Sequence, residues 1–187
     1  MNTLIVVAHP RRTSLTHAVA STFATGIGKA GHTVEWADLV EESFDPVLRE
    51  GDEPDWSNPD KAYTKEVGRE IERIKRNAAT VMIFPVWWWS LPAILKGWID
   101  RVWNHGFAYG AKTYPHQRVW MIAVAGVGES MYRAGSYDIA FRTQMTSGIL
   151  EYCGVVDRRV ELLFGSLEGP GRITQILART AEIATEY

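Results

Sequence analysis

Three consecutive tryptophans, Trp87, Trp88 and Trp89, are the residues of this chain with the clearest chemical potential. They follow the apolar run Thr80–Phe84, which is typical of a buried parallel strand. Neighbouring side chains in a turn or an extended segment point in different directions, so three adjacent indoles cannot all enter one core. At least one must face a cleft, a partner subunit or solvent, and solvent is unfavourable for so much apolar surface. Beyond the carboxyl end of a strand, such indoles would either hold a flat aromatic ligand or pack in a dimer interface.

A polar loop, His9–Thr16, follows the first apolar run of the chain and leads into a helix. It carries a histidine and three hydroxyl groups, those of Thr13, Ser14 and Thr16. The free amides and the dipole of a helix N-terminus suit a phosphate group, although a capped helix without a ligand is the alternative. The loop contains neither GxGxxG nor GxxxxGK(S/T), so neither a Rossmann dinucleotide site nor a P-loop is supported.

A third loop, Gly126–Ser130, contains two glycines that allow close approach of a ligand to the backbone. Its amides could reach the polar edge of a ring that stacks on an indole. Together the three loops offer an anion site, an aromatic plane and amide donors. This combination fits the head of a flavin mononucleotide better than a free sugar or a peptide.

Alternating strands and helices must position these loops. Apolar runs predict strands at residues 4–8, 34–38, 80–85, 119–125 and 156–164. Helical spacing predicts helices at residues 14–30, 60–76, 92–103, 137–153 and 172–187, with loops at 39–60, 104–117 and 126–132. This pattern predicts an α/β fold in one domain over residues 1–187, with a doubly wound, five-stranded parallel sheet in the order 2-1-3-4-5.

Composition excludes several classes of function. The chain has 187 residues, a net charge of −2 and only scattered basic residues, so no nucleic-acid partner is expected. The single cysteine, Cys153, is expected to be buried and inert, and no metal site is predicted. No apolar stretch reaches the ~20 residues of a membrane span, and no signal peptide precedes the first strand, which predicts a cytoplasmic protein. His32 and His116 are expected to be solvated, and neither a Ser-His-Asp order nor paired carboxylates support a hydrolase.

Several motifs are similar to those of the flavodoxin-like NAD(P)H quinone reductases, which include ancillary reductases of potassium-efflux antiporters. The matching segments are Ala8–Pro10, Thr13–Ser14, Phe84–Trp98, Phe107–Tyr109 and Gly128–Tyr132. The resemblance runs from the first strand to the last helix and is most specific at Pro85–Trp98. It implies a homodimer with a flavin at its interface and two-electron, ping-pong hydride transfer from NADH or NADPH to a quinone-like acceptor.

The resemblance also implies roles for individual residues. It places next to the flavin (FAD or FMN) His9, Thr13, Ser14, Leu15, Thr16, His17, Pro85, Val86, Trp87, Trp88, Trp89, Ala125, Gly126, Val127, Gly128, Tyr132 and Arg172. Trp88 and Trp89 would form the platform for nicotinamide and quinone, and Tyr109 would close the substrate pocket from the partner subunit. Tyr132 would stabilise charge on the ring.

This chain departs from the family pattern at two places. Val127 stands where family members often have glycine, and a histidine that some members place after the tyrosine is absent. Tyr137 could replace it as a proton donor, but with an ordinary pKa of about 10 it would act as a neutral donor. The rival hypothesis is a regulatory or electron-carrier flavoprotein subunit, for example of a membrane antiporter, which would dock through the acidic residues 38–60.

Overall fold

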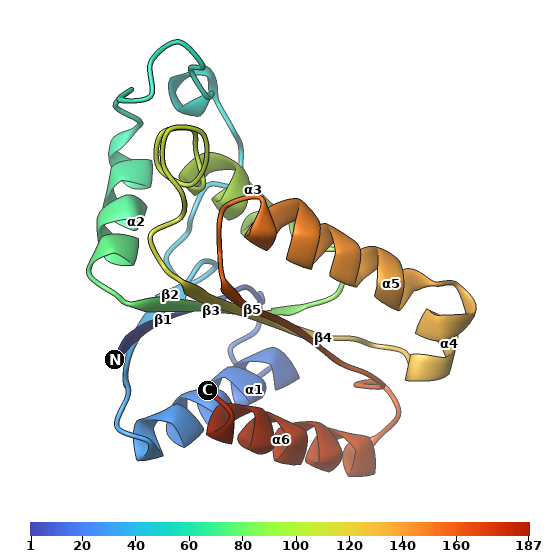
Figure 1. The fold of residues 1–187 in the computed structure, drawn as a ribbon. Coiled ribbons are helices and arrows are strands. Elements are labelled where there is room, and N and C mark those ends of the chain that lie inside the picture. The colour runs from blue at the N-terminus through green and yellow to red at the C-terminus, as the bar shows by residue number, and fades with distance from the viewer.

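Five parallel strands form one sheet in the computed structural model, which describes residues 1–187 (Figure 1). The strands are β1 (Asn2–Val7), β2 (Thr33–Asp38), β3 (Ala79–Pro85), β4 (Arg118–Val124) and β5 (Asp157–Leu163). Their order, β2-β1-β3-β4-β5, confirms the predicted order 2-1-3-4-5. The register pairs Val6 with Met82 and Met82 with Met121 across the three central strands.

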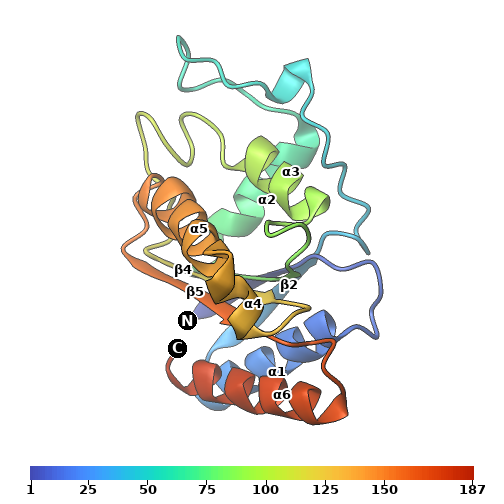
Figure 2. The ribbon, with the colours of Figure 1, turned by 90° about the vertical axis from the view of Figure 1, so that its right-hand side faces the viewer.

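Helices cover both faces of this sheet, as the two perpendicular views show (Figures 1 and 2). On one face lie α1 (Leu15–Lys29) and α6 (Pro170–Thr185); on the other lie α2 (Lys65–Lys75), α3 (Ala93–Val102) and α5 (Tyr137–Arg142). Every residue of β3 is buried, as expected for a strand with helices on both sides. The two ends of the chain meet, because the hydroxyl groups of Thr3 and Tyr187 are 3.0 Å apart.

The helix before β3 starts later than predicted. It begins at Lys65 and not at Asp60, because the Thr64 hydroxyl caps it by accepting from the amide of Val67 at 3.5 Å. The amide of Thr64 is in turn bound by the Asp52 carboxylate at 2.9 Å. These contacts draw residues 60–64 into the loop that follows β2.

Three further boundaries correct the predictions. The short helix α4 (Glu129–Ala134) begins within the segment 126–132, which was predicted as a loop. The helix predicted over residues 137–153 is α5 continued by a π-helical segment, η2 (Thr143–Glu151). The last helix begins at Pro170, whose fixed φ suits the first helical turn, and not at Arg172.

The long loop after β2 is tied to α3 by a buried ion pair. Asp52, at the end of the short 3₁₀ helix η1 (Glu50–Asp52), is 1% exposed and accepts from Arg101 at 2.8 Å.

The environment of His116 also differs from the prediction: the residue was expected to be solvated but is 2% exposed. Its Nδ1 bonds the Thr80 hydroxyl and its Nε2 the carbonyl of Asn77, both at 2.8 Å.

Two other expectations concern bulk properties. Cys153 is buried as predicted, and burial raises the pKa of its thiol to about 11. None of the helices combines the length and the apolar character that crossing a bilayer would require.

Candidate functional site

A cavity of about 480 Å³ lies at the carboxyl ends of β1, β3 and β4. The three loops singled out from the sequence all contribute to its wall. The lining residues are His9, Arg11, Thr13, Ser14, Leu15, Thr16, Pro85, Val86, Trp87, Val124, Gly126, Ser166, Leu167 and Ile173. The loop after β5 was not predicted to take part. Its position was available from the strand order, because β5 is the neighbour of β4 and both strands end at the same edge.

One end of the cavity is the N-terminus of α1. Ser14 caps this helix, and its first turn holds no acidic residue. The amides of Leu15 and Thr16 donate to no acceptor in the protein. Free amides at the positive end of a helix of 15 residues form a suitable environment for an anion.

His9 lies beside this helix end as a neutral hydrogen-bond donor. Its Nδ1 accepts from the amide of Arg11 at 3.0 Å, so the ring proton of the neutral form resides on Nε2. Partial burial, and then the positive charge of Arg11, lower the pKa of His9 below its ordinary value. The ring is therefore uncharged at neutral pH.

His17, which was predicted to contact the anion, is already engaged within the chain. Its Nδ1 is 3.0 Å from the Ser14 hydroxyl and its Nε2 is 2.9 Å from the Asp38 carboxylate. His17 does not line the cavity. It holds Ser14 in place instead, which is a positioning role.

The tryptophan segment forms a tight turn. The backbones of Trp87 and Ser90 pair in both directions, at 3.2 and 3.0 Å. Trp88 and Trp89 occupy the corners with φ of +49° and +59°, a region that residues other than glycine, asparagine and aspartate rarely adopt. Trp87 lines the cavity, and the Trp88 side chain projects into solvent with 94% of its surface exposed. The prediction that the three indoles cannot share one core is confirmed.

Trp89 packs against the two tyrosines that were predicted to act in catalysis. Its ring stacks on Tyr137 with centroids 4.0 Å apart and an interplanar angle of 15°. Tyr132 meets the same indole edge-on at 5.0 Å. Burial raises the pKa of Tyr132 to about 12, so its hydroxyl keeps its proton at neutral pH. The Tyr137 ring also lies on Gly135, where a Cβ would be 2.3 Å from a ring carbon.

The glycine loop after β4 presents unpaired amides. The N–H groups of Gly126, Val127 and Gly128 donate to no acceptor in the protein. The carbonyl groups of Ala125, Gly126 and Val127 already have partners. They accept from the amides of Ser166, Leu167 and Gly165 at 2.9, 3.1 and 2.9 Å, respectively. The amide of Ala125, predicted as a fourth donor, is taken by the carbonyl of Leu163 at 2.8 Å. Three donors are thus available for the edge of a ligand.

Ten predicted residues lie outside the cavity lining: His17, Trp88, Trp89, Ala125, Val127, Gly128, Tyr132, Tyr137, Tyr109 and Arg172. The last two make their contacts elsewhere in the chain. The aromatic neighbours of Tyr109 are Trp56, Tyr152 and His105. Arg172 donates through Nε to the carbonyl of Phe164 at 2.8 Å. Within one chain the fold does not bring either side chain to the cavity.

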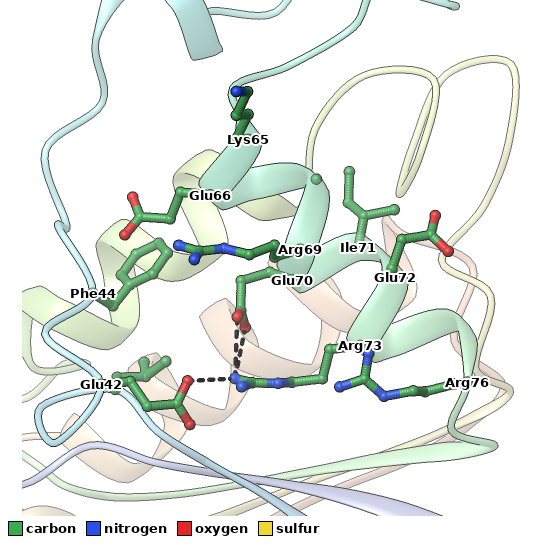
Figure 3. A pocket seen from close by; sticks show the side chains of 12 residues that line it. Glu42, Phe44, Lys65, Glu66, Arg69, Glu70, Ile71, Glu72, Arg73 and Arg76 are labelled. Carbon is green, nitrogen blue, oxygen red and sulfur yellow. Dashed lines mark hydrogen bonds and ion pairs between the residues drawn. The ribbon is translucent and has the colours of Figure 1, made fainter.

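A larger hollow, about 1260 Å³, runs along α2 and the start of the loop after β2 (Figure 3). Its wall carries four carboxylates and four cations. Arg73 contacts Glu42 at 2.8 Å and Glu70 at 3.0 Å, as the dashed lines in Figure 3 show. Burial raises the pKa of Glu70, whose carboxylate also accepts from the Trp98 indole at 2.9 Å. Because the carboxylates and cations of the wall are equal in number, the hollow favours neither an anionic nor a cationic ligand.

Comparisons with known proteins agree with this arrangement. The sequence model of a family with the flavodoxin-like fold matches residues 1–186. An uncharacterized NAD(P)H oxidoreductase of Escherichia coli K12, YcaK, is 41% identical over 133 residues, covering 70% of this chain and 68% of that protein. The structure of an NAD(P)H:quinone oxidoreductase from Methanothermobacter marburgensis is 30% identical, with a TM-score of 0.91 over 98% of this chain and 94% of that one. An FMN-dependent NADH-azoreductase of Bacillus anthracis, solved in complex with FMN, shares the fold at 18% identity and a TM-score of 0.69, over 100% and 99% of the two chains.

Proposed function

The chain belongs to the family with the flavodoxin-like fold, and from this premise we propose that it is an NAD(P)H:quinone oxidoreductase with a bound flavin. One observation carries the proposal: a single cavity joins a helix N-terminus with free amides, the indole of Trp87 and the unpaired amide of Gly126. The unpaired amides of Val127 and Gly128 follow directly in the chain. The names of the relatives in Escherichia coli and Methanothermobacter marburgensis support the same reaction class.

The residues present fit the chemical groups of a flavin. Its anionic tail would lie at the amides of Leu15 and Thr16, with His9 as an additional donor from Nε2. The polar edge of its ring would accept from the amides of Gly126, Val127 and Gly128, which otherwise lack partners. These contacts are common to FMN and FAD.

When bound, the flavin would take a hydride from NADH or NADPH and pass it to the quinone. The protein provides the surface on which the reactants lie. The exposed indole of Trp88 would stack with the nicotinamide and later with the quinone. Because one surface serves both molecules, the oxidised nucleotide must leave before the quinone enters, which is ping-pong order.

Two tyrosine hydroxyls would act as neutral hydrogen-bond donors. Tyr132 is buried and stays protonated, since its pKa is raised to about 12. Tyr137 is held by its stack on Trp89 and would donate to an oxygen of the acceptor. Because Tyr132 keeps its proton at neutral pH, the one proton that the quinol needs besides the hydride would come from solvent.

We further place the protein in the cytoplasm as a homodimer with the flavin at the interface. The exposed Trp88 indole is the kind of surface that a partner covers. A second copy would also explain why Tyr109 lies away from the cavity of its own chain, because it could close the cavity of the other one. The single buried thiol, Cys153, needs no oxidising compartment.

No observation favours the regulatory or electron-carrier alternative. Three of the acidic residues that would form its docking surface are paired within the chain: Glu41 with Arg12 at 2.9 Å, Glu42 with Arg73 at 2.8 Å, and Asp45 with Arg49 at 3.1 Å.

The test begins with chromatography of the pigment that heat releases from the protein as purified. The protein is then loaded with FMN or FAD. Oxidation of NADPH and NADH is then measured with menadione as the acceptor. We expect turnover with KM for menadione raised about three- to tenfold in Trp88→Ala, since an aromatic pair contributes about 0.5–1.5 kcal/mol. Trp36→Ala, at an exposed indole of the edge strand β2, is the control and should leave KM unchanged.

The possible failures have different meanings. A protein that takes up neither flavin at micromolar concentration would overturn the cofactor assignment. A protein that binds flavin but does not turn over would favour the electron-carrier alternative. A single-chain mass by light scattering would refute the dimer alone.

A further inference from the structure

A second cavity, about 340 Å³, lies between residues 59–63, α2 and residues 105–115. It shares no lining residue with the cavity at the indole wall. Its apolar surface comes from Ile71, Phe107 and the ring of Tyr63. The volume is within the usual range of small-molecule sites, about 300–1,000 Å³.

Positive charge gathers around this cavity. Three lysines, Lys61, Lys75 and Lys112, line it against one carboxylate, Asp60. Lys75 contacts Glu72, which lies outside the lining, at 2.8 Å, and Lys112 is 3.8 Å from Asp60; all four side chains are mostly exposed. With Glu72 included, the lysines still exceed the carboxylates by one. The chain as a whole has a net charge of −2, so this local excess of cations is not a reflection of its composition. It also differs from the hollow along α2, where cations and carboxylates are equal in number.

Specific contacts hold the walls of this cavity together. The Tyr63 hydroxyl donates to the carbonyl of His105 at 2.8 Å. Gly106 has φ of +78°, and a Cβ at this position would lie 1.8 Å from the carbonyl oxygen of Pro59, so only glycine allows this approach. The ammonium group of Lys61 donates to the carbonyl of Glu53 at 2.8 Å, which fixes the side chain at the rim. A site whose walls are fixed beforehand loses less conformational entropy on binding.

We infer that this cavity binds a planar organic anion, an aromatic ring bearing one carboxylate or sulfonate group. The ring would lie against Tyr63 and Phe107, and the anionic group would face the ammonium groups of Lys75 and Lys112. The site is independent of the flavin cavity, so the inference stands whether or not the proposed reaction does.

The test uses 2-naphthoate and its neutral counterpart 2-naphthamide, titrated calorimetrically into the flavin-loaded protein. We expect 2-naphthoate to bind with a Kd below about 1 mM and at least about tenfold more tightly than 2-naphthamide. The double variant Lys75→Gln/Lys112→Gln should bind it about three- to tenfold more weakly. Lys29→Gln, at the end of α1 on the opposite face of the sheet, is the matched control and should bind as the wild type does.

Four outcomes would overturn the inference. They are the absence of 2-naphthoate binding, equal affinity for 2-naphthamide, unchanged affinity in the double variant, and loss of binding in Trp88→Ala. The last result would place the ligand at the indole wall. Weaker binding at higher ionic strength would support the inference, because exposed charges are screened.

Discussion

Replacing Gly135 by alanine should displace Tyr137 from its stack on Trp89. The added Cβ would lie 2.3 Å from Cε2 and 2.6 Å from Cζ of the tyrosine ring. Carbon atoms in contact are normally about 3.5–4.0 Å apart, so the ring must shift by about 1 Å or more. The backbone itself tolerates alanine, because Gly135 has φ of −95°. The substitution therefore tests the position of one ring and not backbone strain.

The size of the effect follows from the stack. An aromatic pair contributes about 0.5–1.5 kcal/mol beyond its buried area, so the free energy of unfolding should fall by about 1 kcal/mol. Misplacement of a reacting group by about 1 Å can lower a rate about a hundredfold. We expect quinone reduction to slow by about ten- to a hundredfold in single-turnover measurements, while flavin affinity stays within about twofold of the wild type.

Two variants make this experiment specific. Gly148→Ala is the matched control, because a Cβ there has no neighbour closer than the carbonyl of Thr143 at 3.8 Å. Tyr137→Phe separates the hydroxyl from the ring, because it keeps the stack and removes the donor. If Gly135→Ala keeps both the wild-type rate and the near-ultraviolet circular dichroism of the stacked rings, the reasoning is refuted.

Two further predictions concern stability and can be checked by urea unfolding. Burial lowers the pKa of His116, so between its ordinary value of about 6.5 and the lower folded value the unfolded chain binds more protons than the folded one. The free energy of unfolding is therefore highest above this pH window and falls as the pH falls through it. The fall should be smaller in His116→Gln. An equal loss in the two proteins would contradict this assignment. Asp52→Asn should lower the free energy of unfolding by about 3 kcal/mol, because it leaves the buried Arg101 without its main partner. The control Asp60→Asn, at an exposed carboxylate, should change it by less than about 0.5 kcal/mol. A loss below about 1 kcal/mol in Asp52→Asn would show that Glu66 alone balances Arg101.

Local patterns in the sequence account for most of the sheet. The run that forms β3 is apolar throughout because both of its faces are covered, and the prediction of residues 80–85 differs from Ala79–Pro85 by one residue. Either Ser14 or Thr13 could be expected to cap α1, because a capping hydroxyl acts within three residues; the structure shows Ser14 as the cap. The start of α2 was wrong because the contacts that hold Thr64 outside the helix come from Asp52, twelve residues away.

The site was predictable to a similar extent. The convergence of three loops follows from strand order alone, since parallel strands end at one edge of the sheet. The unavailability of the Ala125 amide and of the His17 ring could not be read from the sequence, because each depends on a partner from another segment, Leu163 and Asp38. The stack of Tyr137 on Trp89 likewise depends on the contour of the chain at Gly135.

The backbone of Trp88 and Trp89 has a consequence for the evolution of this protein. Each holds a left-handed conformation that costs a residue with a side chain about 1–2 kcal/mol, a cost that glycine largely avoids. Selection for thermal resistance alone should therefore enrich Trp88→Gly, and selection for growth that depends on catalysis should remove it. Homologues kept only for their fold would lose these indoles first.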